Sequence, residues 1–105
     1  MTQKETAEAY LKQQLCVDDQ SVIDDIYNEF IPAFKKNLAE ANEAFAKKDW
    51  EALATAAHTL KGDTAIVGLM TLRELAMELQ SAGKSADADA CERLLAALKE
   101  NFVEE

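Results

Sequence analysis

The chain has 105 residues, of which 49 % are hydrophobic, with three glycines and one proline. This composition suits a single packed domain and argues against a disordered segment. Eleven basic residues against twenty acidic ones give a net charge of −9, spread along the chain, which makes nucleic acid and anionic membranes poor partners.

No apolar stretch reaches the roughly 18 residues that a membrane span needs, and the opening residues MTQKETAEAY are too polar for a secretory signal. We therefore expect a cytoplasmic protein. Cys16 and Cys91 each fall within an apolar helical pattern, so we interpret them as reduced packing residues. The sequence alone leaves a disulfide between them open.

Apolar residues recur at intervals of three and four along the chain, without an alternation of period two, and this predicts an all-α fold. The first helix is predicted over residues 2–15, because Thr2 and Glu5 have the spacing of a capping box. Its apolar face comprises Ala7, Tyr10, Leu11 and Leu15. A helix this short is expected to lie over one end of the core.

A long helix is predicted over residues 19–47. Pro32 lacks the N–H that would bond one turn back, so we expect a kink over residues 28–32 rather than a break. The apolar stripe of this helix consists of Ile23, Ile26, Phe30, Phe34, Leu38, Ala41 and Phe45.

The third helix is predicted to begin after Asp49, a favourable N-cap residue, and to end or bend at Gly68. Its inward residues are Trp50, Leu53, Ala57, Leu60, Thr64 and Val67. The spacing of Thr71 and Glu74 predicts a second capping box, which opens a fourth helix that Gly83 closes. The apolar stripe of that helix is Leu72, Leu75, Ala76 and Leu79.

A last helix is predicted from Ser85 or Asp87 to Val103, with Cys91, Leu94, Leu95, Leu98 and Phe102 buried. The short connections predict antiparallel neighbours. We therefore expect an antiparallel up-and-down four-helix bundle with a short additional N-terminal helix, forming one domain over residues 1–105.

His58 is the single histidine. At about 100° per residue it points roughly 130° away from the apolar stripe of the third helix, and therefore toward solvent. The residues in the same sector are mostly small or polar, namely Glu51, Ala54, Thr55, Gly62 and Ala65. Glycine inside a helix costs about 1 kcal/mol relative to alanine, so Gly62 indicates the close approach of a partner. Lys61 can reach a phosphate on the ring.

The stretch AAHTLKGDTAIVGLMTLRELAMEL, residues 56–79, resembles the signature of the histidine-containing phosphotransfer (HPt) domain family. Residues 58–62, HTLKG, match the family core His-x-Leu-Lys-Gly, and Gly68 stands at the second family glycine. Asp63 departs from the small residue that usually follows the first glycine. The resemblance covers most of residues 20–103.

The resemblance implies that His58 carries a phosphoryl group, that Lys61 stabilises it, and that Gln80 hydrogen-bonds the histidine ring. Lys84 matches a basic position of some members and joins the expected docking surface, which comprises Ala54, Thr55, Gly62, Ala65 and Lys84. The implied partners are receiver domains of response regulators and hybrid sensor histidine kinases. Mg²⁺ is expected from the receiver, and no cofactor or metal is expected on this chain, which should be monomeric.

Three other functions are alternatives to this phosphocarrier. An autokinase would need a Gly-rich phosphate-binding motif and a separate ATP-binding domain, for which the chain offers no motif and no room. A metal or haem four-helix bundle is the second alternative, but di-metal sites need paired Glu-x-x-His motifs and the chain has one histidine. The third alternative is a module of the same fold that docks on a kinase or receiver and inhibits it without accepting phosphate.

Overall fold

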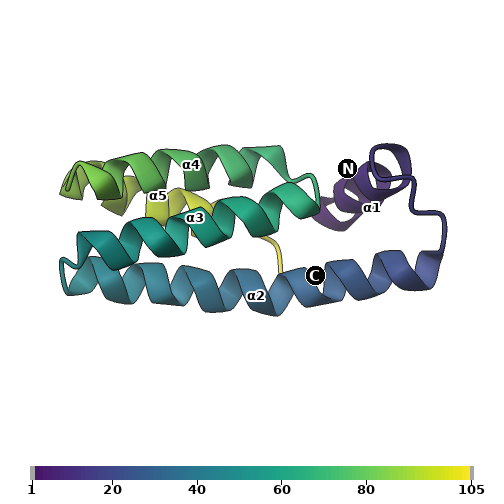
Figure 1. Ribbon diagram of the computed structural model, residues 1–105, viewed down its shortest axis with the longest axis horizontal. Helices are drawn as coiled ribbons and strands as arrows, with labels where there is room; N and C mark the ends of the chain where they lie inside the picture. The colour runs from purple at the N-terminus through teal and green to yellow at the C-terminus, as the bar shows by residue number, and fades with distance from the viewer. Residues whose placement is uncertain (1, 105) are drawn as a thin grey trace.

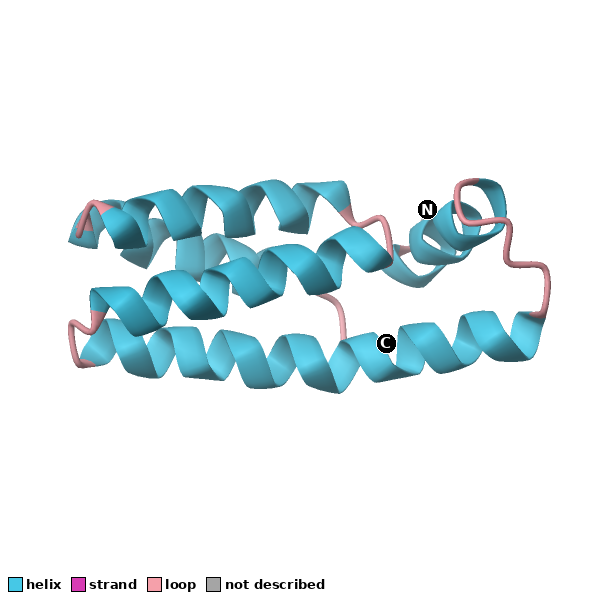
Figure 2. Cartoon of the chain, in the orientation of Figure 1, coloured by secondary structure: helices cyan, strands magenta, loops and turns pink. Residues whose placement is uncertain are grey.

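The computed structural model describes residues 2–104, which form five helices joined by short loops (Figures 1 and 2). The helices are α1 (Gln3–Gln13), α2 (Gln20–Ala46), α3 (Trp50–Ile66), α4 (Met70–Lys84) and α5 (Ala88–Asn101). Helices α2 to α5 run alternately up and down along the long axis, and α1 lies at one end (Figure 1). This arrangement confirms the predicted all-α bundle with an additional N-terminal helix.

The four long helices enclose one apolar core. Each contributes large side chains that are fully buried, among them Phe34, Leu60, Leu79 and Leu98. Helix α3 packs between α2 and α4, and these two contacts are the most extensive in the bundle. Within residues 2–104, no helix combines the length and apolar character that a membrane span requires. The position of α3 matters for the site, because its outer face is flanked by α2 on one side and α4 on the other.

The three connections between bundle helices share one backbone geometry. In each, the residue after the helix C-cap lies in the left-handed region, with φ of 55° at Lys48, 67° at Gly68 and 54° at Ala86. The N–H of the next residue donates to the carbonyl five residues earlier, at 2.9 to 3.0 Å. This is the Schellman motif, which satisfies the last carbonyls of a helix and turns the chain sharply. Three such turns account for the antiparallel order of α2 to α5.

Helix α1 is held at its start by side-chain hydrogen bonds. Thr2 and Glu5 form the predicted capping box, each side chain accepting from the other residue's backbone N–H. The amide of Gln3 donates to the carbonyl of Val103 (2.7 Å) and the hydroxyl of Tyr27 (3.0 Å), and accepts from the N–H of Val103 (2.8 Å). The amide of Gln3 thus ties the first helix to α2 and to the segment after α5.

The start and the end of α4 differ from the prediction. The helix begins at Met70 with Leu69 as N-cap and no side-chain cap, so the predicted capping box of Thr71 is wrong. The turn at Gly68 already fixes where α4 begins, which places Thr71 inside its first turn. Gly83 does not close the helix either, since α4 continues to Lys84 and Gly83 is buried. A Cβ at Gly83 would lie 3.3 Å from the backbone nitrogen of Ala54, so this glycine serves the contact between α3 and α4.

The segment after α1 also differs. The helix ends at Gln13, two residues before the predicted end, and Leu15 is 49 % exposed. Cys16 is exposed with a φ of 53°, so its interpretation as a packing residue is wrong, whereas Cys91 is buried as predicted. Both cysteines are free. Helix α2 is continuous through Pro32.

Candidate functional site

His58 lies on the outer face of α3. The carboxylate of Asp49 accepts a hydrogen bond from the N–H of Ala52 (3.1 Å), which fixes the start of the helix and hence the direction of every residue after it. With the apolar stripe turned into the core, His58 is exposed, as the sequence predicted. Thr55 and Gly62, about one turn to either side, are exposed as well.

Gln80 of α4 lies beside the imidazole. The antiparallel packing of α3 and α4 brings together these two side chains, which are 22 residues apart in the chain, and Nε2 of Gln80 lies 3.4 Å from Nδ1 of His58. This distance is at the long end for a hydrogen bond. Within residues 2–104 the other ring nitrogen, Nε2 of His58, has no hydrogen-bond partner. The ring is therefore oriented through Nδ1, with Nε2 left available.

The amide of Gln80 is coupled to the tautomer of His58. Its NH₂ group faces Nδ1, and in that orientation a neutral ring accepts at Nδ1 and carries its proton on Nε2. A half-turn of the amide would bring Oε1 to Nδ1, which favours the proton on Nδ1 and leaves the lone pair on Nε2. The second orientation is the one that makes Nε2 a nucleophile.

Lys61 follows His58 by three residues on α3 and also lies near Gln80. Its side chain is half-buried and lines a shallow hollow between α3 and α4 together with Met77, Gln80 and Ser81. Among residues 2–104 its ammonium has no ion-pair partner. Three residues of helix separate Lys61 from His58 by about 4.5 Å along the axis, so this charge is available to an anion bound at the ring.

Gly62 is surrounded by open space. A Cβ at this position would meet no atom within 4 Å outside its own helix, so packing within the chain does not require glycine here. In contrast, both Gly68 and Gly83 lie against other residues of the fold. The absence of an internal reason for Gly62 agrees with the expectation that another molecule approaches this surface. Ala65, also expected on the docking surface, is half-buried.

A groove between α3 and α4 begins at His58 and Gln80. Small residues lie in it, with Ala54 only 8 % exposed, so Ala54 contributes to the bottom of the groove rather than to a protruding surface. Lys84 is exposed at its edge. The full lining comprises Trp50, Glu51, Ala54, Thr55, His58, Gln80, Gly83 and Lys84.

Trp50 and Gly83 also belong to this site, although the sequence pattern alone does not predict it. The register between α3 and α4 is what would have revealed these two residues. Because Gln80 lies opposite His58 and the helices are antiparallel, residues 83 and 84 of α4 must lie opposite residues 54 and 55 of α3. Without that register, Trp50 is indistinguishable from a core residue and Gly83 from a helix terminator.

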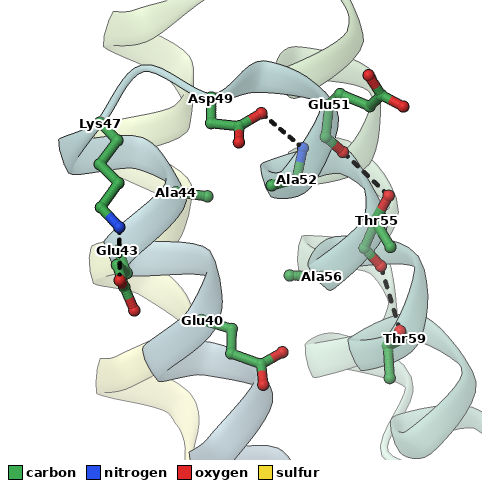
Figure 3. A pocket seen from close by; sticks show the side chains of 10 residues that line it. All are labelled: Glu40, Glu43, Ala44, Lys47, Asp49, Glu51, Ala52, Thr55, Ala56 and Thr59. Atoms are coloured by element: carbon green, nitrogen blue, oxygen red, sulfur yellow. Dashed lines mark hydrogen bonds and ion pairs between the residues drawn. The ribbon is translucent and has the colours of Figure 1, made fainter.

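A second hollow lies between α2 and α3 (Figure 3) and is lined by carboxylates, including those of Glu40, Glu43 and Asp49. His58 is not part of it. Lys47 donates to Glu43 (2.8 Å), and this hydrogen bond lowers the pKa of the Glu43 carboxyl. The carboxylate of Asp49 is occupied in capping α3 (Figure 3). Several carboxylates therefore lie on the α2 side of α3, whereas the α4 side carries the cations Lys61 and Lys84 together with the acids Glu51 and Glu78.

Asp63 belongs to the α2 side as well. Nδ2 of Asn37 donates to Oδ2 of Asp63 at 2.8 Å, in a partly buried contact between α2 and α3. The residue that departs from the family pattern is thus turned away from Lys61 and Gln80, and its carboxylate is satisfied within the fold. Within residues 2–104, no group of three or more His, Cys, Asp or Glu side chains is arranged to hold a metal ion.

Comparison with known proteins identifies the family. The family model of the Hpt domain matches residues 25–104, which include most of α2 and all of α3 to α5 and leave α1 outside the match. No curated protein and no solved structure matches the chain. The matched segment covers more than half of the chain and contains the exposed histidine with its neighbours on α3 and α4. The chain therefore belongs to the Hpt domain family, the phosphotransfer modules of two-component signalling.

Proposed function

We propose that His58 accepts a phosphoryl group from the aspartyl phosphate of a receiver domain and passes it to an aspartate of a second receiver. The observation that carries this proposal is an exposed imidazole with Nδ1 next to Gln80 and, among the described residues 2–104, no hydrogen-bond partner at Nε2. One ring nitrogen is thus held by the protein while the other is free to react. The partners are receiver domains of response regulators or of a hybrid sensor kinase, and the protein acts as a monomer in the cytoplasm.

The transfer begins with neutral His58 carrying its proton on Nδ1, which donates to Oε1 of the turned Gln80 amide. The lone pair on Nε2 attacks phosphorus, the N–P bond forms, and the P–O bond to the receiver aspartate breaks with its electron pair leaving on the carboxylate. No proton has to move in this step, because the ring keeps its proton on Nδ1. Transfer to the second receiver runs through the same bonds in reverse.

Little covalent chemistry is required of the protein, because the transition state for phosphoryl transfer is loose and responds mainly to positioning and charge. Lys61 supplies a positive charge that offsets part of the charge on the phosphoryl oxygens. Mg²⁺ and most of the other catalytic groups come from the receiver, as the family resemblance implies. The carrier itself contributes a nucleophile, its orientation through Gln80 and a surface onto which the receiver fits.

The decisive experiment uses purified protein, Mg²⁺ and several receiver domains phosphorylated with ³²P. We expect acid-labile phosphate on the wild type and none on His58→Gln, with equal thermal stability of the two proteins because the side chain is exposed. Incubation with labelled ATP alone should leave both unlabelled, since the sequence offers no Gly-rich phosphate-binding motif. A folded wild type that accepts phosphate from none of the receivers, but inhibits their dephosphorylation or the kinase, would instead establish the inhibitory module.

A further inference from the structure

The groove between α3 and α4 has a floor of small side chains and one rigid aromatic wall. Ala54 and Gly83 face each other so closely that a Cβ on Gly83 would lie 3.5 Å from that of Ala54. The half-buried ring of Trp50 forms a wall and makes an edge contact with Phe45, with ring centroids 6.2 Å apart. Small residues at the floor and a fixed ring at the side create a preformed hollow whose surface is mainly apolar.

This hollow is continuous with the reacting group. His58 and Gln80 form one end of it, and Ala54 lies about 6 Å from His58 along the helix axis. A receiver must bring its phosphorus to within about 3.5 Å of Nε2 for transfer. Protein contacts of ordinary size cover about 800 Å² per partner. The width of such a contact far exceeds the distance between Ala54 and His58. Any receiver that reaches His58 therefore also covers the groove.

The edge of the groove carries no net charge, and its floor is apolar. Glu51 and Lys84, one acid and one base, are both exposed and lie on its rim, so the rim favours neither an acidic nor a basic side chain. The floor offers methyl and backbone carbon rather than hydrogen-bonding groups. A neutral aliphatic side chain gives up no hydrogen bonds to water on entry and gains the burial of its apolar surface.

We propose that this groove receives an aliphatic side chain that the receiver domain carries beside its phosphorylated aspartate, and that Trp50 and Gly83 thereby help to select which receivers exchange phosphate with His58. The inference rests on the proposed relay function and adds to it a recognition pocket. The groove is preformed, so a receiver with a matching side chain docks without rearrangement of the carrier.

The test fills the groove from its edge. Lys84→Trp places an indole over the hollow at an exposed position, where it does not disturb the core. Lys84→Ala removes the same charge and leaves the groove open. Lys99→Trp is the matched control, because Lys99 is likewise an exposed lysine in the last turn of a helix, on α5. Each variant is phosphorylated in parallel by phosphoramidate, a donor too small to need docking, and by phosphorylated receiver domains.

The measured quantity is the receiver-dependent rate divided by the phosphoramidate rate of the same variant. We expect this ratio to fall about tenfold or more in Lys84→Trp, to fall less in Lys84→Ala, and to remain at the wild-type value in Lys99→Trp. A ratio for Lys84→Trp equal to that for Lys84→Ala would overturn the groove inference alone. A wild type labelled by phosphoramidate but by no receiver would overturn the relay function, and the groove inference with it.

Trp50 provides a second readout, since it is the only tryptophan of the chain. A tryptophan-free receiver in its beryllofluoride form, which mimics the aspartyl phosphate, is titrated into the wild-type protein. Entry of an aliphatic side chain should remove water from the indole and shift its emission to shorter wavelength in a saturable manner. Unchanged emission at receiver concentrations that calorimetry shows to be saturating would overturn the inference.

Discussion

Two of the turns that join the bundle helices have the same backbone but different residues at the critical position. After α3, Gly68 has a φ of 67°, and after α4, Ala86 has a φ of 54°. In both turns the next N–H, that of Leu69 or Asp87, donates to the carbonyl five residues earlier at 3.0 or 2.9 Å. The two turns make the same demand on the backbone, yet only one of them contains glycine.

The difference lies in what packs against each turn. A Cβ at Gly68 would lie 2.1 Å from Cγ and 2.4 Å from Cδ2 of Tyr10, whereas Ala86 is exposed. The left-handed region costs an L residue about 1 to 2 kcal/mol, which the protein tolerates at Ala86. An overlap with the ring of Tyr10 would cost considerably more than this strain. Glycine is therefore required at residue 68 by the docking of α1 rather than by the turn.

The largest effect is expected from Gly68→Ala. Left-handed strain of about 1 kcal/mol and displacement of a packed aromatic ring together should lower the free energy of unfolding by about 3 kcal/mol or more. Urea denaturation followed by far-ultraviolet circular dichroism measures this loss. Since His58 lies ten residues away on the outer face of α3, the fraction of protein that stays folded should still be phosphorylated.

A double-mutant cycle isolates the contribution of Tyr10. In a Tyr10→Ala background the methyl group of Gly68→Ala has room, so the second substitution should cost only the backbone strain, about 1 kcal/mol. An equal cost in both backgrounds would show that the ring contact is not the reason for glycine, and the comparison between the two turns would fail.

The same distinction explains where sequence analysis of the fold succeeded. Helix type and order followed from the period of the apolar residues, and Asp49 was found as an N-cap because capping is a local interaction. Gly68 was placed correctly at a helix end. Gly83 was misread as a second terminator, because sequence does not distinguish a glycine that supplies a backbone angle from one that lets two helices approach. The helix end itself is made by Ala86, which carries no such signal.

The site shows the same difference between features that depend on one helix and features that depend on the contact between two helices. The direction of His58 could be predicted, since it depends only on the rotation of one helix relative to its own apolar stripe. The contact with Gln80 depends on the register between α3 and α4, and only the family resemblance supplied it. Trp50 and Gly83 depend on that same register and were missed.

Gly62 differs from Gly68 and Gly83. Its φ is not positive, and a Cβ at this position would have no neighbour within 4 Å outside its own helix. We expect Gly62→Gln to leave the fold intact and to slow transfer from phosphorylated receivers by about tenfold, since a partner interface that excludes one long side chain loses roughly 1.4 kcal/mol. Rapid-quench measurement of the phosphohistidine gives the rate, with phosphoramidate as the donor that needs no docking. Equal receiver-dependent rates for mutant and wild type would remove the functional reason for this glycine.

A second substitution at residue 62 should have a smaller effect, this time on stability, and its sign should be opposite to that of Gly68→Ala. Gly62→Ala introduces a methyl group into open space and replaces a poor helix former by the best one, so the free energy of unfolding should rise by about 1 kcal/mol. Urea denaturation under the conditions used for Gly68→Ala allows direct comparison. A loss of stability would mean that residue 62 contributes to the fold after all.

The smallest effect is expected from Ala86→Gly, which gives the second turn the residue of the first. Relief of left-handed strain, about 1 kcal/mol or slightly more, is partly cancelled by the greater freedom of glycine in the unfolded chain, about 0.5 to 1 kcal/mol, which leaves a gain near 0.5 kcal/mol. The midpoint of urea unfolding measures it. Because both turns impose the same backbone angle, a small gain at residue 86 beside a large loss at residue 68 assigns the difference to the ring of Tyr10. A gain as large as the loss at residue 68 would assign the difference to backbone strain instead.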